Sequence, residues 1–440
     1  MGIGGSDTIT LFGFIFTMIM GILLICLPRR LAFLPILITV CYMTIGQQVV
    51  IGGLHFSILR LIILLGWLRL SIRRELIRFR FNDMDKLLLS WQASRIALHT
   101  FQIGTTEAFI TICGFAYDAV GMYFLLRFLI RDLKEIPRIV KIISIGIIPL
   151  AILMLIEKST TYNFFSVFGG VSTSTMVDEG GRLRCQGPFR HPILAGTFGA
   201  TLLPLFLGLF YQGPGYRRFA IFGVVAAIII VLTAHSSGPA LSLVFVVFGM
   251  LLWRLRESMR VVRWGGVFAL TALHLIMKDP VWALFGRLSE LVGGSGYHRT
   301  MLISATIRNF DEWWLMGTNY TGHWLPYTLR LDSNMADITN QFIFEGVVGG
   351  LLTMALFIAL ISVGFRAVGR WVLNMVKSNS FSDKIMVWSF GVALFAHVVS
   401  FMSVSYFDQN VVVFYFALAC ISLCSKTVND RNAEEHESTT

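Results

Sequence analysis

Arginines gather in two segments, residues 159–191 and 278–340, that separate long apolar blocks of the chain. Guanidinium groups bind phosphate oxygens bidentately, so a group of arginines at a membrane surface suits a phosphate or diphosphate ligand. Each arginine taken alone could equally be an interfacial residue at the entry of a helix. The members of the set are Arg182, Arg184, Arg190, Arg287, Arg299, Arg308 and Arg330.

The end of the first segment predicts how some of these groups are placed. Residues 181–192 read Gly-Arg-Leu-Arg-Cys-Gln-Gly-Pro-Phe-Arg-His-Pro, and an apolar block follows at once. Pro192 suits the first turn of a helix, and anions are favoured at helix N-termini. We therefore predict that Arg184, Arg190 and His191 help to bind an anion.

The elements that position these residues are apolar helices. Of 440 residues, 55% are hydrophobic and 14% are charged, against about 25% charged in a soluble domain. A membrane-spanning helix needs about 20 mostly apolar residues. The first apolar block, Thr8 to Leu27, is too long for a signal peptide and is expected to be a retained span. We expect a single all-α membrane domain over residues 1–440, with spans near 8–28, 31–51, 54–71, 87–105, 107–130, 142–157, 192–211, 218–234, 239–253, 264–277, 341–363, 386–404 and 408–425.

The formal net charge of +11 is explained by topology rather than by a nucleic-acid partner. With thirteen spans, the basic clusters such as Arg29-Arg30 and Arg217-Arg218 all fall on one side, which the positive-inside rule makes cytoplasmic. Residues 159–191 and 278–340 are then two periplasmic loops, and residues 426–440 form a cytoplasmic tail. The basic clusters would also contact membrane lipid.

Motifs for other chemistry are missing from the sequence. The six cysteines form no CxxC motif, and there is no metal-ligand spacing, phosphate-binding loop or GxGxxG. We therefore expect neither a metal nor a cofactor, and an ATP-driven transporter is disfavoured.

Four motifs resemble those of the O-antigen ligase and O-antigen polymerase superfamily, over roughly residues 100–365. The first is Arg184-x-x-Gly187-x-Phe189-x-x-Pro192 entering an apolar span, and the second is Ser236-Ser237-Gly238, where Ser237 stands in place of the usual Arg. The third is Tyr297-His298-Arg299 followed by Trp313-Trp314-Leu315-Met316-Gly317-Thr318. The fourth is Asp337-Ile338-Thr339-Asn340-Gln341 followed by Glu345-Gly346 and Gly349-Gly350.

This resemblance implies a GT-C-like bundle of about 12–13 transmembrane helices in the bacterial inner membrane, active at its periplasmic face. It implies a metal-independent, inverting glycosyltransferase of lipopolysaccharide or exopolysaccharide biosynthesis. The donor would be a glycan on undecaprenyl diphosphate and the acceptor a saccharide or lipid A-core, with other polysaccharide assembly proteins as partners. The diphosphate would be held by Arg184 and Arg299, with Arg190 and His191 nearby.

The chain departs from the ligase pattern at Thr339, where the family has the His of a His-Asn pair. Threonine cannot act as a base near neutral pH, so polymerase is slightly favoured over ligase. The base would then be Asp337 or His323, ahead of His191 and His298, with Thr339 and Asn340 beside it. The alternatives are a helix N-cap for Asp337 and an interfacial role for His323.

Two ionisable residues inside predicted spans are expected to pair. Arg95 and Asp118 lie in neighbouring spans, and charges inside a membrane usually find a partner, so we predict an Arg95–Asp118 ion pair. A proton or substrate pathway is the alternative for them. For the whole chain, the alternatives are a lipid-linked oligosaccharide flippase or transporter and a non-catalytic subunit of polysaccharide export.

Overall fold

The computed structural model describes residues 8–52, 54–76, 80–178, 180–291, 296–374 and 381–439. It is 76% helical. The described strands form two short antiparallel hairpins: β1 (Gln48–Ile51) with β2 (Leu54–Ser57), and β3 (Met176–Val177) with β4 (Leu183–Arg184). The predicted all-α class is confirmed at this level.

A helix lies at each predicted span, although not every helix is long enough to cross a bilayer. Within the described residues, seven helical segments are long and apolar enough, and two shorter apolar helices cover Leu11–Cys26 and Gln409–Cys424. These define a helical membrane protein. The helices at the predicted spans are α1 (Leu11–Cys26), α2 (Phe33–Tyr42), α3 (Ile58–Ile72), α4 (Asp83–Ile103), α5 (Thr106–Leu129), α6 (Ile136–Thr160), α7 (Pro192–Phe210), α8 (Pro214–Ala234), α9 (Ser237–Leu251), α10 (Met259–Ile276), α14 (Gln341–Asn374), α15 (Phe381–Phe401) and α16 (Gln409–Thr439).

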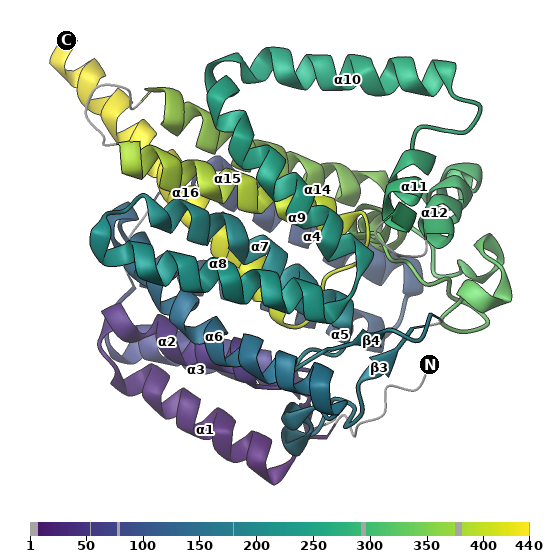
Figure 1. Ribbon diagram of the computed structural model, residues 1–440, viewed down its shortest axis with the longest axis horizontal. Coiled ribbons are helices and arrows are strands. Elements are labelled where there is room, and N and C mark those ends of the chain that lie inside the picture. The colour runs from purple at the N-terminus through teal and green to yellow at the C-terminus, as the bar shows by residue number, and fades with distance from the viewer. Residues whose placement is uncertain are drawn as a thin grey trace.

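The segment 278–340 carries its own helices, which are α11 (Ala283–Leu291), α12 (Gly296–Arg308) and α13 (Phe310–Trp313). They lie at the same end of the bundle as the β3–β4 hairpin (Figure 1). We call this end the loop end. It is where α6 ends and where α7, α9 and α14 begin.

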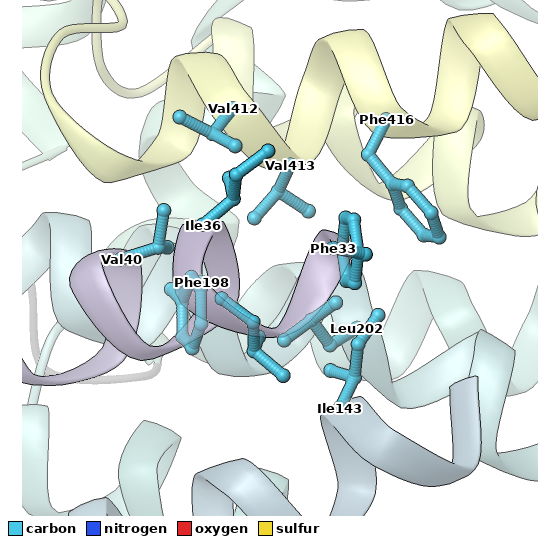
Figure 2. A pocket seen from close by; sticks show the side chains of 10 residues that line it. Phe33, Ile36, Val40, Ile143, Phe198, Leu202, Val412, Val413 and Phe416 are labelled. Atoms are coloured by element: carbon cyan, nitrogen blue, oxygen red, sulfur yellow. The ribbon is translucent and has the colours of Figure 1, made fainter. Parts of the chain in front are cut away.

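The centre of the bundle is formed by α7 and α15, whose apolar windows are each 83% buried. Small residues bring α7 close to α8: a Cβ on Gly199 would lie 2.8 Å from the carbonyl oxygen of Ala227. Such close backbone approach is how helices gain packing contacts in a membrane. In Figure 2, side chains of α2, α6, α7 and α16 surround a small void lined by hydrocarbon alone. An apolar void of this kind offers water no hydrogen bond, so it is a packing defect and not a site.

Helix α14 is interrupted where a turn from the preceding segment docks against it. Gly349 and Gly350 have non-helical backbone angles, with φ 70° at Gly350. The freed groups pair with the 314–318 turn, because Leu351 N donates to Trp314 O (2.8 Å) and Thr318 N donates to Val347 O (2.9 Å). Irregular backbone inside a membrane protein needs such internal partners.

Helix α10 lies apart from the packed helices (Figure 1). None of its residues is buried, and its apolar side chains are open to the surroundings. A short 3-10 segment, η4 (Leu252–Ser258), joins it to α9 through a kink at Leu255.

Candidate functional site

The segment that carries Arg184 and His191 is fixed by a carboxylate from α6. Glu157 is 1% exposed, and its two oxygens accept hydrogen bonds from the backbone N–H groups of Gln186 (3.0 Å) and Gly187 (2.9 Å). Asn163 adds a hydrogen bond to the carbonyl of Gly187 (2.8 Å). A carboxylate that accepts two N–H bonds holds a loop firmly, because losing it would leave both donors buried without partners.

Two helix N-termini meet beside this segment. A Cβ on Gly196, in the first turns of α7, would lie 2.7 Å from the ring of Pro239 near the start of α9. His191 is the N-cap of α7, and its Nδ1 accepts a hydrogen bond from Ile193 N (3.2 Å). His191 thus takes up an N–H group of the first turn of α7, and the positive ends of the two helix dipoles lie close together, which favours an anion near them.

Arg184 and Arg299 face this region together. The charge of Arg184, added to burial, lowers the pKa of Arg299 to about 10, and it also lowers the pKa of His191. Arg299 Nη1 donates to Ser237 Oγ (3.2 Å), in the first turn of α9. The two arginines predicted from the sequence to bind diphosphate are thus within range of each other's charge, and Arg184 also acts on His191, although the arginines are 115 positions apart in the chain.

Among the residues that the structure describes, neither guanidinium group has a counter-ion in contact. The side chain of Arg184 makes no hydrogen bond or ion pair with another described residue, and its buried Nε is left without a partner. Asp178 is the carboxylate whose charge reaches it, but Asp178 accepts hydrogen bonds from Gly180 N and Arg182 N within its own hairpin. Two partly buried, unneutralised guanidinium groups stabilise a bound anion strongly, because water screens them little.

His191 is held neutral in this environment. Burial is the main cause, and the charge of Arg184 adds to it, so that the pKa of His191 falls to about 4. Its unprotonated Nδ1 already accepts the hydrogen bond from Ile193 N that caps α7. His191 therefore takes part as a neutral hydrogen-bonding group and adds no positive charge to the pair of arginines.

His298 precedes Arg299 directly in the chain, and Asp337 lies against His298. His298 Nε2 lies 3.1 Å from the carbonyl oxygen of Asp337. Burial lowers the pKa of His298 and raises the pKa of Asp337, and the charge of each opposes the shift of the other. A carboxylate whose pKa is raised toward neutrality is better matched to accepting a proton from a hydroxyl.

The residues just before α14 show which side chain caps this helix and which side chains could contact a ligand. Asn340 is the residue that caps α14, since its Oδ1 accepts from Phe342 N (3.0 Å) and Ile343 N (3.2 Å), so the N-cap alternative for Asp337 is wrong. Thr339 Oγ1 is buried without a hydrogen-bond partner among the described residues. Asp337 and Thr339 are thus the two side chains here that are free to meet a ligand.

His323 is engaged elsewhere. Its Nε2 lies 2.9 Å from Glu312 Oε1, its ring stacks on Tyr320 at 5.0 Å, and its side chain is 39% exposed. No interaction with Arg184 or Arg299 accompanies these contacts within the described residues. His323 is a weaker candidate base than Asp337 on this geometry.

Arg190 is directed away from the other two arginines. It hydrogen-bonds the carbonyl of Gly46 and forms an ion pair with Asp408 (Nε to Oδ2, 3.3 Å). The diphosphate cradle predicted from the sequence therefore lacks its third arginine.

The expected Arg95–Asp118 ion pair is wrong, because each residue has another partner. Asp118 pairs with Arg60 (3.3 Å), which the sequence analysis did not single out. Arg95 pairs with Glu345 (3.4 Å), a fully buried carboxylate of α14 that also accepts from Trp91 Nε1 (2.9 Å). Helical periodicity placed two charges in adjacent spans, but it could not place Arg60 and Glu345 next to them.

Sequence reasoning did not name Arg60, Glu157 and Asp408, and it named Ser237 and Glu345 only as members of motifs. Glu157 offered one signal, since a carboxylate near the end of an apolar block needs a partner, and the loop that follows supplies it. No described group of three or more His, Cys, Asp or Glu side chains could hold a metal ion.

Comparison with known proteins found no relative of this chain. No protein-family model matches the chain, and a search of curated proteins also gives no match. The assignment of a function therefore depends on the geometry of the loop end.

Proposed function

We propose that the protein transfers a glycan from an undecaprenyl-diphosphate carrier to an acceptor saccharide, as an O-antigen or exopolysaccharide polymerase or ligase at the periplasmic face of the bacterial inner membrane. The proposal rests on one observation: the charge of Arg184 acts on Arg299 beside two helix N-termini, and no carboxylate of the described residues is in contact with either. Such a site is matched to a ligand that carries at least two negative charges.

The chemistry assigned to this site is a displacement at the anomeric carbon. An acceptor hydroxyl oxygen attacks that carbon, and the bond from the carbon to the diphosphate oxygen breaks. The electron pair stays on the diphosphate, whose growing charge Arg184 and Arg299 stabilise. The hydroxyl proton passes to the carboxylate of Asp337, and the configuration of the sugar inverts. Thr339, which stands where the ligase pattern has His, leaves Asp337 as the base and favours polymerase.

Binding and transfer are tested separately. Purified protein in lipid nanodiscs is titrated with undecaprenyl diphosphate, and Arg184→Ala and Arg299→Ala are each expected to weaken binding about 10–100-fold, as for loss of a strong charge-assisted contact. Arg287→Ala is the matched control, because Arg287 lies on the exposed face of α11 and pairs with Asp279. Unchanged binding in both site variants would overturn the proposed cradle.

Asp337→Asn tests the chemical step. With a lipid-linked glycan donor and a saccharide acceptor, this variant should bind undecaprenyl diphosphate normally but lose about 10²–10⁴-fold in transfer rate, the range for general base catalysis. Normal transfer by Asp337→Asn would remove Asp337 from the mechanism. A wild-type protein that binds the carrier but moves it across the bilayer, without forming a glycosidic bond, would replace the transferase by a flippase.

The flippase alternative has one observation in its favour. Charged residues at several depths line a second cavity: Arg60, Arg95, Asp118, Arg190 and Asp408. However, each of them lies in the loop-end half of its helix, at the helix middle or in a loop at that end. The buried ion pairs of the far half, Arg127–Asp85 and Arg69–Glu75, do not line this cavity, so the lining charges do not continue across the bundle, which favours a reaction at one face.

A further inference from the structure

A larger cavity lies next to the proposed diphosphate site. It has a volume of about 420 Å³, within the usual range for small-molecule sites. It is lined by residues of the β1–β2 hairpin and the two residues 45–46, of α3, α4, α5, α14, α15 and α16, of the 405–408 segment, and by Arg190. Its size alone sets it apart from the hydrocarbon-lined void of Figure 2.

The lining combines aromatic rings with charged groups. Trp91, Phe115, Phe344, Tyr406 and Tyr415 are among the rings. Aromatic faces carry partial negative charge and attract the C–H groups of a flat apolar face. Sugars present such a face together with hydroxyl groups at their edge, so rings beside charged hydrogen-bonding groups suit them.

The charges around the cavity balance. Arg60 pairs with Asp118, Arg190 with Asp408 and Arg95 with Glu345, at distances of 3.3, 3.3 and 3.4 Å. Three guanidinium groups therefore meet three carboxylates. A phosphate would disturb this balance, whereas an uncharged ligand would keep it, in contrast to the unneutralised Arg184 and Arg299.

The ion pairs leave hydrogen-bonding capacity unused. Each is longer than the 2.7–2.9 Å of a strong charged hydrogen bond. Asp408 Oδ2 and Arg95 Nε are buried and have no hydrogen-bond partner in the described protein, and Arg95 as a whole is only 6% exposed. Buried charged groups with unmet hydrogen bonds are costly unless something supplies the missing partners.

The cavity also adjoins the proposed reaction centre. Gln341, which lines it, follows Asn340 directly, and its Oε1 accepts from Tyr406 N (2.7 Å). Arg190, also in the lining, precedes His191. The segment 337–341 therefore runs from Asp337, which lies against His298, to Gln341 in the wall of the cavity.

We propose that this cavity binds an uncharged sugar unit of a glycan chain, through hydrogen bonds to Asp408 and Arg95 and stacking on the lining rings. The inference rests on the proposed function for the source of the glycan. The binding site itself can be tested without any transfer reaction.

The test is hydrogen–deuterium exchange of the purified protein in nanodiscs, with maltose, lactose and chitobiose as neutral probes and pyrophosphate as the charged probe. At a sugar concentration about tenfold above a millimolar dissociation constant, at least one disaccharide should slow exchange in residues 404–411. Pyrophosphate should not protect this segment. Protection by pyrophosphate alone, or by none of the sugars, would overturn the proposal.

Two cavity variants and one control variant test whether the protecting sugar is bound in the cavity. Val411→Trp fills the cavity and should abolish it, whereas Val244→Trp, on the exposed face of α9, should leave it unchanged. Asp408→Asn is the milder change, because Asn tolerates the left-handed backbone at this position (φ 54°). It should weaken the sugar about tenfold, as for one hydrogen bond to a charged group. Protection that survives both cavity variants would place the sugar elsewhere.

The source of the glycan is then assigned by kinetics. If the sugar belongs to the acceptor, Asp408→Asn raises the KM for acceptor and leaves the KM for the lipid-linked donor unchanged; the reverse identifies the donor glycan. Failure of the proposed function is distinguishable, since it would abolish transfer in the wild type while sugar protection of residues 404–411 remained.

Discussion

Glu157 and Gly187 form a hydrogen bond of 2.9 Å that ties the end of α6 to the loop before α7. The second oxygen of the carboxylate takes the neighbouring N–H of Gln186. Arg184 lies two positions before this pair of N–H groups and His191 four positions after it. A buried carboxylate in α6 thus sets the position of the residues proposed to bind diphosphate.

Replacing this carboxylate should affect both stability and binding. Glu157→Ala leaves two buried N–H donors unpaired, at about 1–3 kcal/mol each, so the free energy of unfolding should fall clearly. Glu157→Gln keeps one acceptor oxygen and should recover part of the loss. Thermal unfolding and undecaprenyl diphosphate binding, with the exposed Glu107→Gln as control, provide the measurement. Normal carrier binding by folded Glu157→Ala would refute the positioning role.

The protein should lose stability as the pH falls from about 6.5 to about 4 through His191. The pKa of this group is lowered from 6.5 to about 4 in the folded state, so the unfolded chain binds the extra proton first. Stability is then fully present above pH 6.5 and declines below it, by at most about 1.4 kcal/mol per pH unit. Chemical denaturation across this range measures the decline.

His191→Asn is the matched variant for that measurement. Asn keeps an acceptor for the N-cap of α7 but does not titrate. Its stability curve should be flatter than that of the wild type between pH 6.5 and 4. Parallel curves would show that another group causes the acid sensitivity.

The break in α14 should be intolerant of a side chain at Gly350. Its φ of 70° disfavours other residues, and a Cβ there would lie 2.5 Å from the carbonyl oxygen of Leu315. Gly350→Ala should therefore lower the thermal unfolding temperature, through strain and displacement of the 314–318 turn. Gly369→Ala, in the same helix with open space around it, should be neutral or slightly stabilising. Equal effects at the two positions would contradict the docking of the turn.

The partners of the buried charges can be verified by double-mutant cycles on unfolding. Arg60→Ala and Asp118→Ala should show an interaction energy of about 0.5–3 kcal/mol, as expected for residues in contact. Arg95→Ala with Asp118→Ala should be close to additive. Strong coupling of Arg95 with Asp118 instead would restore the pairing that the sequence suggested.

Apolar block length and the proline at residue 192 were enough to predict where most helices lie. The span predicted at 31–51 was only partly right, because α2 ends at Tyr42 and a hairpin begins at Gln48. Short β-structure of this kind depends on cross-strand partners, which an apolar run does not reveal.

The candidate site was predictable where a residue acts through its own charge, and not where its role depends on a distant partner. Arg184 and Arg299 were singled out from the seven loop arginines through the motifs of the resembled family, and the role implied for them depends on their own charge. The sequence did not show that Arg190 differs from them in having a counter-ion, because its partner Asp408 lies far away in the chain. The same reason hid the roles of Arg60 and Glu345.

The sides of helix α10 contact the surrounding lipid or detergent and not other helices of the bundle. It has no buried residue, and its contacts are with η4 at one end and, through His274, with Val281 and Trp282 at the other, so we expect acyl chains to cover its sides in a bilayer. Its tilt and its distance from α9 should therefore vary with lipid thickness and with the detergent used for extraction. Annular lipid, and not side-chain packing, would then determine how far the chain segment leading into α11 and α12 can shift.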